Sequence, residues 1–118
     1  MGLEFTRVEQ GLAETRLEIQ AHHLAPNGFL HAGTVVTLAD STAGFGASAS
    51  LPEGAIGFTT VDLSCNFLGT STDGVILARG VMVHSGRTTQ LWDVTVRRED
   101  REKPMALFRC TQLVLYPR

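Results

Sequence analysis

Long apolar runs are missing from this sequence, and none approaches the roughly 20 residues that a membrane-spanning helix needs. The first 19 residues carry six charged side chains without the apolar centre of a secretory signal peptide, so we expect no signal peptide. Only two cysteines occur, Cys65 and Cys110, and both lie in apolar stretches. Buried, reduced thiols are the expected state of such residues. These features predict a soluble cytoplasmic protein with no membrane partner.

An excess of positive charge is also missing. The chain has 10 basic and 12 acidic residues, a net charge of −2, and basic residues that are dispersed along the sequence. Proteins that bind nucleic acid carry a basic patch or stripe, so no nucleic-acid partner is expected. Hydrophobic residues make up 43% of the chain and charged residues 19%. This balance predicts a folded domain rather than a disordered chain.

Motifs for metal, nucleotide and serine-hydrolase chemistry are absent. His22 and His23 are adjacent, but no third ligand follows at a suitable spacing, so we expect polar loop residues and no metal. His84 precedes Ser85, yet no G-x-S-x-G motif occurs, and a loop contact is the simpler interpretation. No G-x-G-x-x-G motif follows a strand within a βαβ unit. We therefore expect no cofactor.

The patterns that are present predict one domain, residues 1–118, made of six strands and one helix. The expected strands cover about residues 3–8, 12–19, 56–67, 74–83, 88–98 and 105–116, and the helix covers residues 33 to about 50. Residues 98–103 are all charged and are expected to form a solvated hairpin tip. Two strands, one helix and four strands define an α+β fold with an antiparallel sheet of about six strands.

The helical segment is rich in glycine and alanine, which makes it weak helix material in isolation, because glycine costs about 1 kcal/mol relative to alanine. A helix with such small side chains is useful where a sheet must approach it closely. One helix covers only one face of a six-stranded sheet, and other strand faces also carry apolar residues. We therefore expect the remaining apolar surface to be buried in a homodimer or a pair of dimers, a homotetramer.

Asp40 is the only charged residue between His31 and Glu53, and it falls in the middle of the expected helix. Burying an unpaired carboxylate is costly, but a desolvated carboxylate suits a general base or nucleophile. Its predicted neighbours on the helix face, at i−4, i+3 and i+7, are Val36, Ala43 and Ala47. The alternative is a partly exposed Asp40, or one satisfied by Thr37, Ser41 or the backbone of a partner.

The start of the helix predicts an anion-binding site. His31, Ala32 and Gly33 follow the turn formed by Pro26, Asn27 and Gly28, so free N–H groups point out of the first helical turn. Nine residues separate His31 from Asp40, which corresponds to about 13 Å along a helix. This distance is too long for one catalytic centre. The two parts can meet only if they come from different subunits.

Residues 28–33, Gly-Phe-Leu-His-Ala-Gly, and residues 38–40, Leu-Ala-Asp, resemble a known family signature. The signature is the G-x-x-H-G-G…L-A-[DE] motif of PaaI-like and hydroxybenzoyl-CoA-type hotdog-fold acyl-CoA thioesterases. The resemblance implies a hotdog fold, in which an antiparallel sheet wraps around one central helix. It also implies that Asp40 is the catalytic carboxylate, that the Ala32 N–H polarises the thioester carbonyl, and that His31, with Gly33 beside it, sets the geometry of the loop.

The same resemblance implies roles for other segments. A hydroxyl near Thr60, in residues 59–63, would position water across a dimer. The loop of His84, Ser85, Gly86 and Arg87 would contact the phosphates or pantetheine of CoA, and a guanidinium suits phosphate. CoA is then part of the substrate rather than a cofactor.

Two positions depart from the family pattern. Ala32 stands where the motif has its second glycine, directly after the histidine, and an alanine supplies the same N–H. Ala25 stands where some members carry Gln or Asn to orient substrate or water, and the nearby Asn27 is a candidate substitute.

Two functions therefore remain as hypotheses. The first is an acyl-CoA thioesterase. The second is a hotdog module that binds CoA or acyl-CoA without turnover, and Ala25, in place of a polar residue, favours this second function. An apolar acyl pocket for an aromatic or medium-chain group is expected beside Phe45, Phe58 and Phe67.

Overall fold

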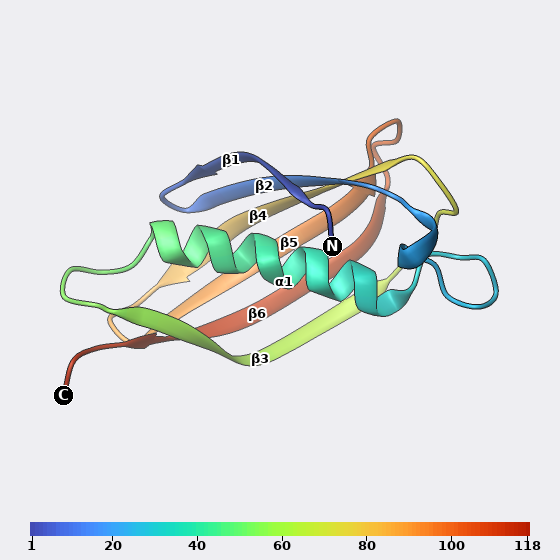
Figure 1. The fold of residues 1–118 in the computed structure, drawn as a ribbon. Coiled ribbons are helices and arrows are strands. Elements are labelled where there is room, and N and C mark those ends of the chain that lie inside the picture. Colours follow the sequence, from blue (N-terminus) through green and yellow to red (C-terminus); the bar gives the residue numbers. More distant parts are fainter.

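Six antiparallel strands and one long helix make up the fold in the computed structural model, which describes residues 1–118 (Figure 1). The elements are β1 (Glu4–Glu9), β2 (Leu12–Glu18), η1 (Ala21–His23), α1 (Ala32–Ala49), β3 (Gly57–Phe67), β4 (Val75–Ser85), β5 (Thr89–Arg98) and β6 (Pro104–Leu115). The strands form one sheet in the order β1-β2-β4-β5-β6-β3. The predicted α+β hotdog fold is confirmed, and each main element lies within two residues of its expected bounds.

The sheet curves around α1, as Figure 1 shows. Leu38, Ala39, Ala43 and Ala47 are completely buried on the face of the helix that packs on the sheet. Small side chains allow this close approach, and Gly46 is the extreme case, because a Cβ atom there would overlap the indole of Trp92. Neither α1 nor the short η1 is long and apolar enough to span a membrane.

Buried polar groups in the core are hydrogen-bonded. The hydroxyls of Thr15 on β2 and Thr42 on α1 lie 2.7 Å apart, and Thr42 also donates to the Leu38 carbonyl at 2.7 Å. Gln90 on β5 accepts from the Trp92 indole N–H and donates to the Ser50 carbonyl. These bonds tie the helix to the sheet without leaving a buried polar side-chain atom unpaired.

His23 corrects one prediction. The sequence suggested a polar loop residue, yet His23 is only 3% exposed. Its Nδ1 accepts from the Gln20 N–H at 2.9 Å, and its Nε2 lies 2.8 Å from the Met1 carbonyl oxygen. His22, by contrast, is exposed as expected. His23 thus links Met1 to η1, and both of its ring nitrogens have a hydrogen-bond partner inside the protein.

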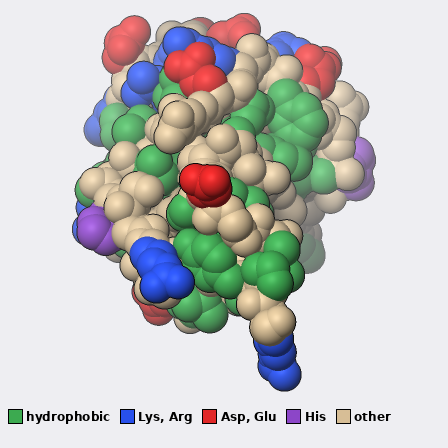
Figure 2. Space-filling view, turned by 90° about the vertical axis from the view of Figure 1, so that its left-hand side faces the viewer, with side chains coloured by type: hydrophobic (Ala, Val, Ile, Leu, Met, Phe, Trp, Pro, Cys, Tyr) green, Lys and Arg blue, Asp and Glu red, His purple; other side chains and the backbone are tan.

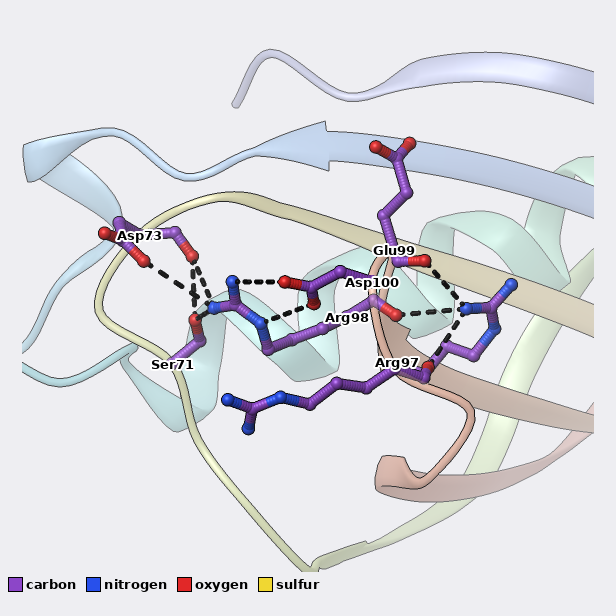
Figure 3. Close-up of polar contacts among 7 residues, drawn as sticks. Ser71, Asp73, Arg97, Arg98, Glu99 and Asp100 are labelled. Atoms are coloured by element: carbon purple, nitrogen blue, oxygen red, sulfur yellow. Dashed lines mark hydrogen bonds and ion pairs between the residues drawn. The ribbon is translucent and has the colours of Figure 1, made fainter.

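The charged β5–β6 hairpin is only partly the solvated tip that the sequence suggested. Residues 99–103 are exposed, but the Arg98 side chain is 17% exposed. Its guanidinium donates to the Asp100 carboxylate, to the Asp73 carbonyl at 2.9 Å and to the Ser71 hydroxyl (Figure 3). Arg98 therefore fastens the loop before β4 to the hairpin, because five donors in a planar fork can serve several acceptors at once.

Candidate active site

Asp40 lies at the middle of α1 and is half-buried. It lines a hollow of about 400 Å³ between the helix and β3. The other residues around the hollow are Ser41, Gly44, Phe45, Ser48, Phe58 and Thr60. Asp40 is the only charged group among them, so the hollow presents one carboxylate on a largely uncharged wall.

The predicted neighbours of Asp40 on the helix face were wrong in part. Ala43 and Ala47 are fully buried in the core, whereas Asp40 opens toward Gly44 and Ser48. The reason is the rotation of about 100° per residue, which places i+3 and i+7 on the sheet side and leaves i+4 and i+8 beside the hollow. Thr37 does not satisfy the carboxylate, since its hydroxyl donates to the Gly33 carbonyl at 2.8 Å.

Thr60 lies beside Asp40 of the same chain, whereas the family resemblance placed its hydroxyl across a dimer. Its Oγ1 lies 3.5 Å from Asp40 Oδ1 and 2.8 Å from Gln112 Oε1. A bulge between Thr60 and Asp62 shifts the register of β3 against β6. Thr60 pairs directly with Gln112 in this register, and Gln112 is completely buried.

Gln112 is a site residue that the sequence reasoning missed. It lies on the inner face of β6 with Phe108, Cys110 and Val114, at the period of two expected for that face. The signal was a polar residue at an otherwise apolar inward position. Such a residue needs a buried partner, and here that partner is Thr60.

The start of α1 is a capped turn, which the sequence analysis did not predict. His31 is the N-cap, and its Nδ1 accepts the Gly33 N–H at 2.8 Å. The Thr34 and Val35 N–H groups donate to the His31 carbonyl. Ala32 is the first helical residue, and its N–H donates to no acceptor within the chain. The turn thus leaves the Ala32 donor available, while Gly33 is occupied by the cap.

The two remaining groups of predicted site residues lie away from Asp40 in a single subunit. Asn27 is exposed, and its Oδ1 accepts from the Phe29 N–H at 3.1 Å within its own loop.

His84, Ser85, Gly86 and Arg87 form the β4–β5 hairpin. This hairpin lies beside the C-terminal end of α1, opposite His31 (Figure 1). Arg87 stacks over the Tyr116 ring at 5.7 Å from its centroid, and the Tyr116 hydroxyl donates to the Arg87 carbonyl.

Figure 2 shows the end of the molecule that carries this hairpin, where hydrophobic patches alternate with uncharged polar groups and the charges gather mainly along one margin. No three side chains of the types His, Cys, Asp and Glu converge into a metal-binding arrangement.

The edge strand β3 leaves apolar side chains uncovered next to the hollow. Leu63 and Phe67 pair with Cys110 and Ala106 on the inner, helix-facing side of β6, yet they are 43% and 48% exposed. Val61, at the bulge, is 56% exposed. The backbone of β3 has a strand partner on one side only. An unpaired edge with exposed apolar side chains is a surface that pairs readily with another strand.

Comparison with known proteins places this fold and motif in a family. The family model for the Thioesterase superfamily matches residues 27–105. The chain is 32% identical over 111 residues to 1,4-dihydroxy-2-naphthoyl-CoA hydrolase from Listeria monocytogenes, covering 94% of this chain and 89% of that protein. The protein therefore belongs to the Thioesterase superfamily and is a hotdog-fold thioesterase.

Solved structures agree with this assignment. A thioesterase from Haemophilus influenzae superposes with a TM-score of 0.88 at 26% identity, covering 97% of this chain and 78% of that one. A Streptococcus mutans protein bound to acetyl-CoA superposes with a TM-score of 0.90 at 27% identity, covering 100% of this chain and 92% of that one.

Proposed function

We propose that this thioesterase hydrolyses an acyl-CoA, with Asp40 as the carboxylate that acts as general base or nucleophile. The observation that carries the proposal is the position of Asp40, the only charged residue of α1, in the wall of an otherwise uncharged hollow. The similarity to a protein named as an acyl-CoA hydrolase and to a structure bound to acetyl-CoA supports CoA esters as the substrate class.

A second copy of the chain completes the site in this proposal. Asp40 and Ala32 are eight residues apart on one helix, about 12 Å at 1.5 Å per residue, so the Ala32 N–H of the same chain cannot reach a thioester beside Asp40. Antiparallel pairing of two β3 edges about a two-fold axis would cover Leu63 and Phe67. It would also bring the helix start of one copy toward the opposite end of the other.

The chemistry then follows from two groups. In the general-base route, Asp40 takes a proton from water, and the resulting hydroxide adds to the thioester carbon. The Ala32 N–H of the second copy stabilises the oxyanion that forms on the carbonyl oxygen. The C–S bond breaks as the intermediate collapses, and the CoA sulfur takes the proton from Asp40. In the nucleophilic route, the carboxylate adds to the thioester carbon, the C–S bond breaks and CoA leaves as the thiolate. Water then cleaves the mixed anhydride, which regenerates Asp40 and supplies the proton that the thiolate takes up. The products are the same acid and CoA.

CoA recognition is assigned to His84, Ser85, Gly86 and Arg87, with Asn27 at the mouth of the site. The proposed two-fold arrangement supports this assignment. It places the start of α1 in one copy near the β4–β5 hairpin of the other copy. The guanidinium of Arg87 is exposed and matches phosphate oxygens. Its stacking on Tyr116 holds it at the surface.

The acyl group is proposed to be aromatic. Phe45 and Phe58 line the hollow together with Asp40 and Gly44, so two aromatic side chains form part of its wall. Phe67, which the sequence also suggested, does not line it. The naphthoyl-CoA named for the Listeria relative is consistent with such a wall.

The deciding experiment compares Asp40→Asn with Asp62→Asn in an assay of free thiol release from benzoyl-, naphthoyl-, acetyl- and decanoyl-CoA. Asp62 is an exposed carboxylate on the same site strand, β3, and serves as the matched control. We expect Asp40→Asn to lower kcat by about 10²–10⁴-fold and Asp62→Asn to leave it unchanged. Full activity of Asp40→Asn would remove Asp40 from the mechanism.

The alternative function is a module that binds CoA or acyl-CoA without turnover, which Ala25 favours because it lacks the polar group of other members. Thermal stabilisation of the wild-type protein by acyl-CoA, without thiol release from any ester of the panel, would support this alternative.

A further inference from the structure

The side chain of Gln112 is connected to Asp40 through a chain of polar contacts. Thr60 Oγ1 lies 2.8 Å from Gln112 Oε1 and 3.5 Å from Asp40 Oδ1. On its other side, Gln112 Nε2 lies 3.4 Å from Cys110 Sγ. Gln112 and Cys110 are both completely buried, so no solvent competes for the contact between them, whereas Thr60 and Asp40 line the hollow.

A hydroxyl has one proton to donate, so the Thr60 hydroxyl can donate to only one of its two neighbours in this chain of polar contacts. With the amide oriented as in the structure, both Gln112 Oε1 and Asp40 Oδ1 are acceptors for the Thr60 hydroxyl, and the shorter contact is the one to Gln112, while Gln112 Nε2 donates to Cys110 Sγ. We take Thr60 to donate to Gln112 in this orientation. This arrangement turns oxygen lone pairs of Thr60 toward the negative carboxylate of Asp40, and it gives an amide donor to a weak sulfur acceptor.

A rotation of the Gln112 amide by 180° exchanges its oxygen and its NH₂ group, which have nearly the same shape. The thiol of Cys110 then donates to Gln112 Oε1, Gln112 Nε2 donates to Thr60, and the Thr60 hydroxyl donates to Asp40. Each donor meets a suitable acceptor, and the last bond in the chain is assisted by the charge of the carboxylate.

We propose that Gln112 is a positioning residue that directs the Thr60 hydroxyl proton onto Asp40 Oδ1, with the Cys110 thiol fixing the orientation of the Gln112 amide. This inference rests on the proposed role of Asp40. Holding one carboxylate oxygen leaves the other free to face water or the thioester carbon. The 3.5 Å contact shortens when substrate fills the hollow, as hydrogen bonds in unoccupied active sites commonly do.

The state of the Cys110 thiol agrees with its role as a donor. Burial and the nearby negative charge of Asp40 raise the pKa of Cys110 to about 12, so the thiol keeps its proton at neutral pH. Cys65 is the other titratable group on the strand faces that turn toward α1, and burial raises the pKa of its thiol as well. Asp40 therefore has no charged partner on these faces, and the hydroxyl of Thr60 is its nearest polar contact on β3.

The first test is kinetic and uses Gln112→Met, Thr60→Val and the double variant. We expect each single variant to lower kcat about tenfold with little change in KM, the scale of one hydrogen bond to a charged group. The double variant should be no slower than Thr60→Val alone, because Gln112 acts through that hydroxyl. Thr60→Ser should retain most of the activity. Independent, multiplying effects of the two single variants would overturn the proposal.

Gln90→Met is the matched control. Gln90 is also completely buried, pairs with Gln112 across β5 and β6, and makes two hydrogen bonds that do not lead to Asp40. It should lower the denaturant midpoint without lowering kcat of the folded enzyme. An equal loss of kcat in Gln90→Met and Gln112→Met would assign both effects to general loosening of the core, and would also overturn the proposal.

The second test does not depend on activity. Neutron diffraction from crystals of the deuterated full-length chain locates the Thr60 deuteron and distinguishes the two ends of the Gln112 amide. We expect the deuteron on the line to Asp40 and the amide nitrogen toward Thr60. A Thr60 deuteron on the line to Gln112 would refute the proposed chain of hydrogen bonds, even if the enzyme is active. A wild-type protein without thioesterase activity would instead refute the proposed function while leaving the hydrogen-bond chain to this measurement.

Discussion

Gly46 on α1 faces the indole ring of Trp92 on β5 with no space for a side chain between them. This contact sets how closely the helix approaches the centre of the sheet, and Trp92 itself is completely buried. Gly44, two residues earlier, has a different environment, because a Cβ atom there would lie 3.5 Å from Phe58, an ordinary contact. The two glycines therefore serve different purposes in one helix.

Exchange of each glycine for alanine should separate these purposes. We expect Gly46→Ala to lower the free energy of unfolding by about 1–3 kcal/mol, because the methyl group overpacks the core. Gly44→Ala should be neutral or raise the stability by up to about 1 kcal/mol, since alanine is the better helix former. Urea denaturation of both variants makes the comparison. Equal stability of the two would show that α1 shifts freely on the sheet.

The edge of β3 should carry the proposed subunit contact. Leu63 points to the helix side of the sheet and is exposed in a single chain, while its neighbour Ser64 points to the opposite face. We expect Leu63→Asp to produce monomers and to lower kcat/KM about a hundredfold or more, since a misplaced oxyanion donor is costly. Ser64→Asp is the matched control and should retain the assembly.

Analytical ultracentrifugation gives the oligomeric state of both variants, and the thiol assay gives their activity. A wild-type protein that sediments as a monomer with full activity would contradict the need for a second copy at the site.

Stability at acidic pH should depend on the pair between Asp93 on β5 and Arg109 on β6. Two hydrogen bonds of 2.6 and 2.8 Å join them on the outer face of the sheet. Hydrogen bonding to Arg109 lowers the pKa of Asp93 below its ordinary value of about 3.9. The pair therefore stabilises the folded state at pH values above the ordinary pKa of an aspartate. This contribution is lost as the pH falls through the lower pKa that Asp93 has in the folded state.

Comparison of the wild type with Asp93→Asn by urea denaturation at several pH values tests this dependence. The wild type should be more stable at neutral pH by a small amount, because the pair is largely exposed to solvent. The difference should shrink below about pH 4. A difference that grows toward acidic pH would show that Asp93 is better protonated than charged in the folded state.

The sequence was a good guide to elements whose pattern is local. Alternation of Trp92, Val94 and Val96 with Asp93 and Thr95 identified β5 and its buried face, because successive side chains of a strand point to opposite sides. Helical spacing of the apolar residues placed the helix start at residue 33, one residue from its observed start at Ala32, since that spacing also depends on neighbours only a few positions apart. Such patterns can be recognised in the sequence because they depend on backbone geometry within one element.

Contacts between distant segments were beyond that reasoning. His23 was expected on the surface and is buried against Met1, and Arg98 was expected in a solvated tip and binds Ser71 and Asp73. Both side chains are polar, and their burial depends on acceptors that the chain supplies 22 to 27 residues away. Local composition carries no information about such partners.

By itself, the sequence determined the order of the elements, the buried face of β5 and the lone acid on the helix, since hydrophobic periodicity and steric limits act over a few residues. Only the tertiary structure decided that Thr60 stands beside Asp40 and that Gln112 stands behind Thr60. The pairing of β3 with β6, and the bulge that sets their register, join positions 52 residues apart. That register depends on the packing of the whole sheet around the helix.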